Sequence, residues 1–229
     1  MKIRFIEHLL QLFYPNLCIV CGENLMSAEK FICHHCIAGI PRTNFHLLRD
    51  NPVEKRFWGK TNIYRATSFF HFQKGSHYRT LLHELKYKNN PEIGDFLGAL
   101  AASEILDSDW ATTVNMVIPV PLHPSKLAKR GYNQSDYIAR GVARILNAEV
   151  QTDLLIRTLE NETQTRKSVF QRFENTQGIF EFKANTDLTN KHILIVDDVL
   201  TTGSTLEACI RSIPDFPGLK ISVFTLAVA

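Results

Sequence analysis

The sequence lacks any apolar run approaching the ~20 residues that a helix needs to cross a bilayer, so we expect no membrane span. It also lacks internal repeats, low-complexity segments and the G-x-x-x-x-G-K-[ST] pattern of nucleoside-triphosphate P-loops. Neither acidic nor basic residues are in large excess. The 26 basic and 23 acidic residues give a net charge of +3, which is too small to predict nucleic-acid binding or to exclude it.

Four of the five cysteines form two C-x-x-C pairs near the start of the chain, Cys18 with Cys21 and Cys33 with Cys36. Each pair can supply two thiolates from one tight turn, so the two pairs together suit a tetrahedral structural Zn²⁺ site. Two disulfides, or a redox or unligated role, are the alternatives. A zinc site needs reduced thiols, which indicates a reducing compartment, and we expect the cytoplasm.

Composition divides the chain into three parts. Residues 1–45 hold an expected helix at Met1–Tyr14 and the cysteine module, which is too small for a core of its own and would depend on metal. Residues 46–60 read as a linker or covering segment. In residues 61–229, strands alternate with helices, which predicts an α/β domain with a parallel sheet. The expected strands are 63–72, 114–121, 154–156, 178–183, 193–199 and 221–228, and the expected helices are 78–87, 91–106, 134–147 and 206–213.

The most informative stretch is His192–Glu207, HILIVDDVLTTGSTLE. Its apolar start predicts a strand buried on both faces, which ends in Asp197 and Asp198. The loop Thr201–Thr205 then enters a helix, and its hydroxyl groups and free backbone N–H groups would bind a phosphate. The two acids, at the carboxyl edge of the strand, can accept hydrogen bonds from the vicinal hydroxyls of a sugar attached to that phosphate.

Basic residues gather in two other segments. Lys126, Lys129 and Arg130 follow the strand at 114–121, where they would suit a pyrophosphate, although a solvated basic turn is the alternative. Residues 157–175 are polar, basic and poorly periodic, which favours a mobile flap. Lys86, near the end of an expected helix, could face a phosphate or solvent.

The pattern V-D-D-V-x-T-T-G-x-T resembles the 5-phosphoribosyl-1-pyrophosphate (PRPP) signature of type I phosphoribosyltransferases. The resemblance implies that Asp197 and Asp198 bind the ribose hydroxyls and that the following loop binds the 5′-phosphate. It also implies that Mg²⁺ accompanies PRPP. The expected PRPP-binding set is Asp197, Asp198, Val199, Leu200, Thr201, Thr202, Gly203, Ser204, Thr205, Lys126, Lys129 and Arg130.

Over nearly its full length the chain resembles the ComF family, small bacterial proteins with a zinc module and a phosphoribosyltransferase-like domain, associated in some members with DNA uptake in competence. The resemblance rests on the cysteine pairs, the PRPP signature and further short segments. These segments are Leu85–Tyr87, Ile118–Leu122, Lys129–Gln134, Gln164, Arg172 and Asn175.

The resemblance implies a phosphoribosyltransferase that releases pyrophosphate. Asp197 and Asp198 would position the ribose, and Arg166, Lys167 or Arg172 of the flap would cover the pyrophosphate and exclude water. The alternative is a non-catalytic PRPP-sensing adaptor that binds single-stranded DNA or a DNA-uptake protein. The sequence does not identify an acceptor.

Overall fold

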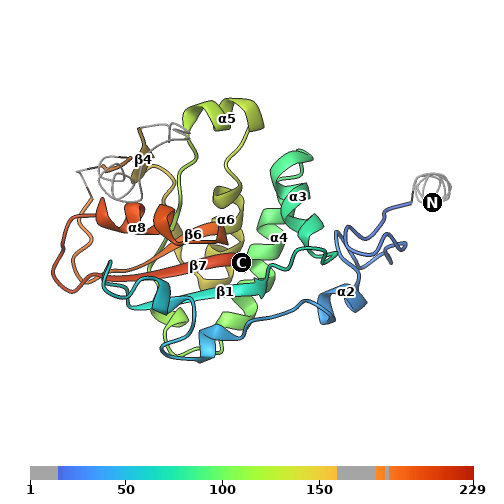
Figure 1. The fold of residues 1–229 in the computed structure, drawn as a ribbon, viewed down its shortest axis with the longest axis horizontal. Helices are drawn as coiled ribbons and strands as arrows, with labels where there is room; N and C mark the ends of the chain where they lie inside the picture. The colour runs from blue at the N-terminus through green and yellow to red at the C-terminus, as the bar shows by residue number, and fades with distance from the viewer. Residues whose placement is uncertain (1–14, 159–178, 184–185) are drawn as a thin grey trace.

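The computed structural model describes residues 15–158, 179–183 and 186–229. Its main sheet has five strands, all parallel, in the order β1-β7-β6-β2-β3 (Figure 1). This arrangement confirms the expected α/β class with a parallel sheet. The strands are β1 Arg65–His71, β2 Met116–Pro119, β3 Glu149–Val150, β6 His192–Leu200 and β7 Lys220–Val228.

Strand β6 lies inside the sheet and is buried on both faces, as its composition predicts. Leu194 and Val196 pack into one core with the helices α4 (Glu92–Ile105) and α6 (Gln134–Leu146). Ile193 and Ile195 pack into a second core on the other face, with α8 (Ser204–Arg211). Because successive side chains of a strand point to opposite faces, both layers hold β6 in register.

The other helices of the described residues are short, and α2 lies in the cysteine module, away from the sheet (Figure 1). They are α2 His34–Ala38, α3 Arg79–Tyr87 and α5 Pro124–Arg130, with 3₁₀ turns η1 Phe45–Leu47, η2 Glu54–Arg56 and η3 Ala111–Thr113. The segment 46–60 covers one side of the sheet, because Val53 and Phe57 are buried in its second core. The domain limits at residues 45 and 60 stay a prediction.

Two expectations about the strands and loops are wrong. Residues 122–133, which carry Lys126, Lys129 and Arg130, were expected to form a loop but contain α5, whose N-cap His123 accepts a hydrogen bond from the Ser125 backbone N–H at 3.1 Å. Residues 178–183 do not return to the main sheet. Their strand β5 (Phe180–Phe182) pairs antiparallel with β4 (Leu155–Arg157) in a separate two-stranded sheet. The expected helix at residues 1–14 and most of the expected flap lie outside the described residues.

None of the helices within the described ranges has the length and apolar character needed to span a membrane.

Glycines let α4 and α6 approach each other closely. A Cβ added at Gly98 of α4 would collide with the backbone carbonyl of Ile138, and one added at Gly141 of α6 would collide with that of Asp95. These backbone atoms cannot move aside like the end of a flexible side chain. The close contact fixes α6, and with it the two residues that begin this helix, Gln134 and Ser135.

The replacement Gly141→Ala tests this packing. We expect it to lower the free energy of unfolding by about 1–3 kcal/mol, because overpacking forces the helices apart. Urea denaturation measures the change. Ser103→Ala, at an exposed position of α4, is the control and should change stability by less than about 0.5 kcal/mol. A Gly141→Ala protein as stable as the control would contradict the account.

Candidate functional site

The carboxyl end of β6 carries two acids whose partners come from α6 and α3. Asp198 Oδ2 accepts a hydrogen bond from Gln134 Nε2 at 2.9 Å and forms an ion pair with Lys86 Nζ at 3.1 Å. Asp197 Oδ1 accepts hydrogen bonds from Ser135 Oγ at 3.0 Å and from the Asp198 backbone N–H at 2.8 Å. Both acids line one cavity, so neither is sealed within the core.

The environment of Asp197 opposes its negative charge. Burial, and then the charge of Asp198, raise the pKa of Asp197 to about 7. The hydrogen bonds from Asp198 N–H and Ser135, and the charge of Lys86, act in the opposite direction without cancelling this effect. Near neutral pH the Asp197 carboxyl group in this cavity therefore gains or loses a proton easily.

The elevated pKa predicts a pH-dependent effect of Asp197→Asn. Because the pKa of an unfolded Asp is about 3.9, ionisation of Asp197 opposes folding increasingly between about pH 4 and pH 7. Relative to the native chain, the variant should gain roughly 1–3 kcal/mol of unfolding free energy at pH 8 and almost none at pH 4. Urea denaturation at both pH values gives the comparison. A difference that does not change with pH would refute the assignment.

The loop after the acids has the geometry of an anion cradle. Gly203, the N-cap of α8, has a φ of 86°, a left-handed conformation that suits glycine, and it has no side chain that could make a capping hydrogen bond. Thr202 Oγ1 accepts a long hydrogen bond of 3.4 Å from the Ser204 backbone N–H. The hydroxyls Thr202 Oγ1 and Ser204 Oγ lie 3.0 Å apart on the exposed side of the loop. Backbone N–H groups, hydroxyls and the positive end of the helix dipole together favour a phosphate.

A cavity of about 550 Å³ joins the acids, the loop and the basic helix α5. Of the expected PRPP-binding residues, those that line it are Asp197, Asp198, Val199, Thr201, Thr205, Lys126 and Arg130. Thr202, Gly203 and Ser204 belong to the same loop, outside the cavity lining. The side chain of Leu200 is buried in the second core, and Lys129 does not line the described cavity. Arg166, Lys167 and Arg172 lie outside the described residues.

Sequence reasoning missed several residues of this cavity. Gln134 and Ser135 donate hydrogen bonds to the acids, but the sequence pattern predicts only that they begin a helix. Gln134 is also the last residue of a segment that resembles the ComF family. Arg157 also lines the cavity, and its Nε is buried without a hydrogen-bond partner among the described residues. Its guanidinium carbon lies 5.3 Å from the centre of the Phe180 ring. A buried unpaired donor of this kind suits an anionic ligand.

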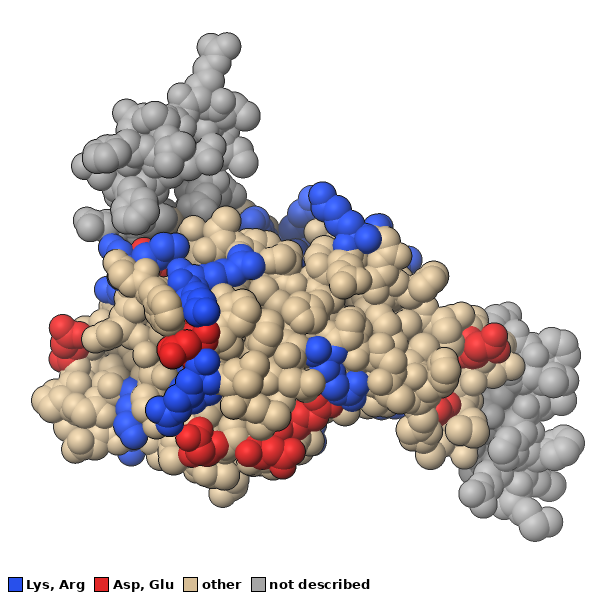
Figure 2. All heavy atoms as spheres, turned by 60° about the horizontal axis from the view of Figure 1, so that its bottom comes forward, with Lys and Arg blue, Asp and Glu red and all other residues tan. Residues whose placement is uncertain are grey.

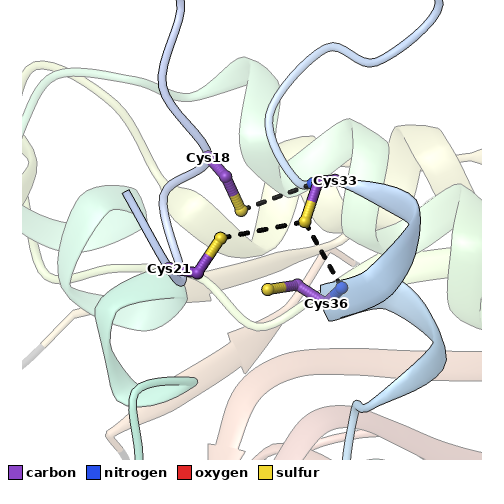
Figure 3. A group of neighbouring side chains, drawn as sticks. All are labelled: Cys18, Cys21, Cys33 and Cys36. Atoms are coloured by element: carbon purple, nitrogen blue, oxygen red, sulfur yellow. Dashed lines mark hydrogen bonds between the residues drawn. The ribbon is translucent and has the colours of Figure 1, made fainter. Parts of the chain in front are cut away.

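The four N-terminal cysteines converge, as their spacing predicts. Their Sγ atoms all lie within 4.8 Å of one another, and those of Cys21 and Cys33 are 3.8 Å apart (Figure 3). In a tetrahedral site with Zn–S bonds of about 2.3 Å, the sulfurs are separated by about 3.8 Å. No disulfide joins any of the four cysteines, so the structure does not support the two-disulfide alternative. The cluster therefore fits a zinc ion.

The thiols also influence one another's charge. Burial opposes ionisation of Cys18, but hydrogen bonds from the backbone N–H groups of Cys21 and Cys33 outweigh it and lower the pKa of Cys18 to about 7. Burial, then the neighbouring thiols, raise the pKa of Cys36 well above its usual range. Four thiolates would repel one another at this distance, and a divalent cation would remove that repulsion.

We expect about one zinc ion per chain in the purified protein, measured by atomic absorption. Cys33→Ser should lose most of that zinc, because it removes one of four ligands. Cys209→Ala should retain it, because this fifth cysteine is buried in α8. Zinc-free native protein, or an unchanged zinc content after Cys33→Ser, would contradict the prediction.

Helix α3 connects the cysteine module to the acids. At its start, Tyr78 OH donates a hydrogen bond to the Cys36 carbonyl at 2.9 Å, and Thr80 Oγ1 donates to the Ile19 carbonyl at 3.1 Å. Near its end, Lys86 pairs with Asp198. The module thus holds one end of the helix that reaches the site with its other end.

Comparisons with known proteins identify the domain. The family described as phosphoribosyl transferase domain matches residues 133–227, which include the acids and the loop. The chain is 29% identical over 205 residues to DNA utilization protein YhgH of Escherichia coli O157:H7, covering 86% of this chain and 83% of the relative. It is 25% identical over 228 residues to competence protein F of Haemophilus influenzae, covering 95% of this chain and 99% of that relative. It is 26% identical over 220 residues to competence protein ComFC of Bacillus subtilis, covering 92% of this chain and 83% of that relative.

The parallel sheet, the acid pair and the matched family define an α/β protein with a phosphoribosyltransferase-like domain. The competence and DNA-utilization relatives extend the similarity to most of the chain, and they confirm the resemblance to the ComF family.

Proposed function

We propose that this chain binds PRPP and transfers its phosphoribosyl group to an acceptor with release of pyrophosphate. One observation carries the proposal: Asp197, Asp198 and residues of the loop Thr201–Thr205 open into the same cavity. A sugar phosphate needs this combination, because its phosphate binds an anion cradle while its hydroxyls need acceptors a few ångströms away. The phosphoribosyl transferase family match supports the same reading.

Each part of the cavity then has a role. The loop Thr201–Thr205 holds the 5′-phosphate, and the two acids accept hydrogen bonds from the ribose hydroxyls. Lys126 and Arg130 of α5 hold the pyrophosphate, and Arg157 adds the guanidinium that has no hydrogen-bond partner for its Nε among the described residues. These cations stabilise the negative charge that grows on pyrophosphate as its bond to C1′ breaks. We propose that the pyrophosphate is covered by Arg166, Lys167 or Arg172.

The donor set also fits Mg²⁺. This ion prefers carboxylate and phosphate oxygens, and Asp197 and Asp198 are the two acids among the described residues of the cavity. Bound with PRPP, Mg²⁺ would neutralise part of the pyrophosphate charge. The protein itself positions the ribose and excludes water, so no covalent nucleophile is needed. We propose a cytoplasmic location, because the cysteines are free thiols.

The double replacement Asp197→Asn with Asp198→Asn should abolish PRPP binding while leaving the fold intact, because the amides keep the shape of the acids and lose their charge. Isothermal titration calorimetry with PRPP and Mg²⁺ measures binding, and circular dichroism monitors the fold. Asp109→Asn is the control, because Asp109 is 64% exposed and pairs with Arg49 away from the cavity. Unchanged PRPP affinity in the double variant would refute the proposal.

The second candidate is a non-catalytic adaptor that senses PRPP and binds single-stranded DNA or a DNA-uptake partner. The printed names of the relatives, DNA utilization protein and competence protein, support it. The face drawn in Figure 2 gives it less support, because Lys and Arg side chains are interspersed with Asp and Glu there. Nucleic-acid surfaces usually present a contiguous basic patch.

Two measurements separate the candidates. PRPP turnover in the presence of Mg²⁺ and a panel of amines and nitrogen heterocycles supports the transferase. Salt-dependent binding of single-stranded DNA without any turnover supports the adaptor, because phosphate contacts weaken as salt rises.

A further inference from the structure

One face of α3 forms a wall of the cavity that the proposed PRPP contacts leave largely unused. Five of the nine residues of this helix line the cavity. Their spacing of i, i+3, i+4, i+7 and i+8 places them along a single face of the helix. Leu81 and Leu85 pack into the core, and Leu82 both packs into that core and lines the cavity, so the cavity-facing side of the helix borders its core-facing side. The lining residues are Arg79, Leu82, His83, Lys86 and Tyr87.

The wall presents aromatic rings to the cavity. The rings of His83 and Tyr87 have their centres 5.1 Å apart at an angle of 47°. Tyr87 is 68% exposed, and the Arg130 guanidinium carbon lies 5.7 Å from the centre of its ring. Phe72, just beyond the end of β1, also lines the cavity. Exposed rings in a concave site favour a flat ligand that stacks against them.

The wall is also positively charged. It carries Arg79 and Lys86 but no acid, and within the described part of the chain Arg79 has no carboxylate partner. Lys86 is paired with Asp198. A protonated amine would be repelled by these cations, whereas a ligand with a negative group would gain a charge-assisted hydrogen bond.

We propose that Arg79, His83, Lys86 and Tyr87, here called the α3 wall, form the acceptor subsite, and that the acceptor is a planar aromatic ring with a carboxylate or similar anionic group. This inference rests on the proposed function. A ring nitrogen would supply the electron pair for the new bond to C1′. The C1′–O bond would break, pyrophosphate would leave with its electrons, and any proton on that nitrogen would pass to water.

Matched pairs of ring compounds test the inference with the full chain. Ligand-observed NMR titrations, with and without PRPP and Mg²⁺, would compare benzoate with benzamide and pyridine-3-carboxylate with pyridine-3-carboxamide. The carboxylates should bind about tenfold more tightly than the amides. Arg79→Gln should remove most of that preference, and Tyr87→Ala should weaken both members of each pair. Lys88→Gln, at the end of the same helix and outside the cavity lining, is the control and should behave like the native chain.

The PRPP affinity of each variant, measured by calorimetry, separates the two proposals. It should stay within about twofold of the native value in Arg79→Gln, because Arg79 lies outside the proposed PRPP contacts. Tyr87→Ala does not serve this comparison, because the Tyr87 ring lies against Arg130, a proposed pyrophosphate contact. Equal binding of carboxylates and amides, or a preference that survives Arg79→Gln, would overturn the acceptor assignment while PRPP still binds. If the native chain does not bind PRPP, the proposed function itself is overturned.

Discussion

The Asp198 carboxylate is the point at which three distant segments of the chain meet. It lies at the end of β6, accepts a hydrogen bond from Gln134 at the start of α6, and pairs with Lys86 near the end of α3. An almost fully buried carboxylate is costly unless it is paired in this way. The same contacts therefore stabilise the fold and leave two acids facing one cavity. The close glycine contact between α4 and α6 packs the helix that begins with Gln134.

The cysteine module takes part in this arrangement although none of its described residues lines the cavity that contains Asp197 and Asp198. Cys18, Ile32 and Cys36 pack into the same core as Leu81 and Leu85 of α3. Two hydrogen bonds then hold the start of that helix against the module. A metal ion that orders the module would consequently order α3 as well. This explains how a small zinc module could matter to a site that it does not touch.

Much of the architecture could be predicted because its determinants are local. The apolar run that ends in Asp197 and Asp198 predicts a buried strand, and the cysteine spacing predicts the cluster. The helix α5 was missed because PSKLAKR is short, polar and without buried residues. The strands β4 and β5 were expected in the wrong sheet, since pairing depends on tertiary contacts that composition does not encode. The Lys86–Asp198 ion pair joins residues far apart in the chain, so no local sequence pattern predicts it.

The account depends on the acids and the loop acting on one ligand. A crystal structure of the protein soaked with PRPP and Mg²⁺ tests this most directly. The account predicts the 5′-phosphate against the backbone N–H groups of Thr201–Thr205, the ribose hydroxyls on Asp197 and Asp198, and the pyrophosphate beside Lys126 and Arg130. PRPP bound elsewhere, or an empty cavity at saturating PRPP, would contradict it.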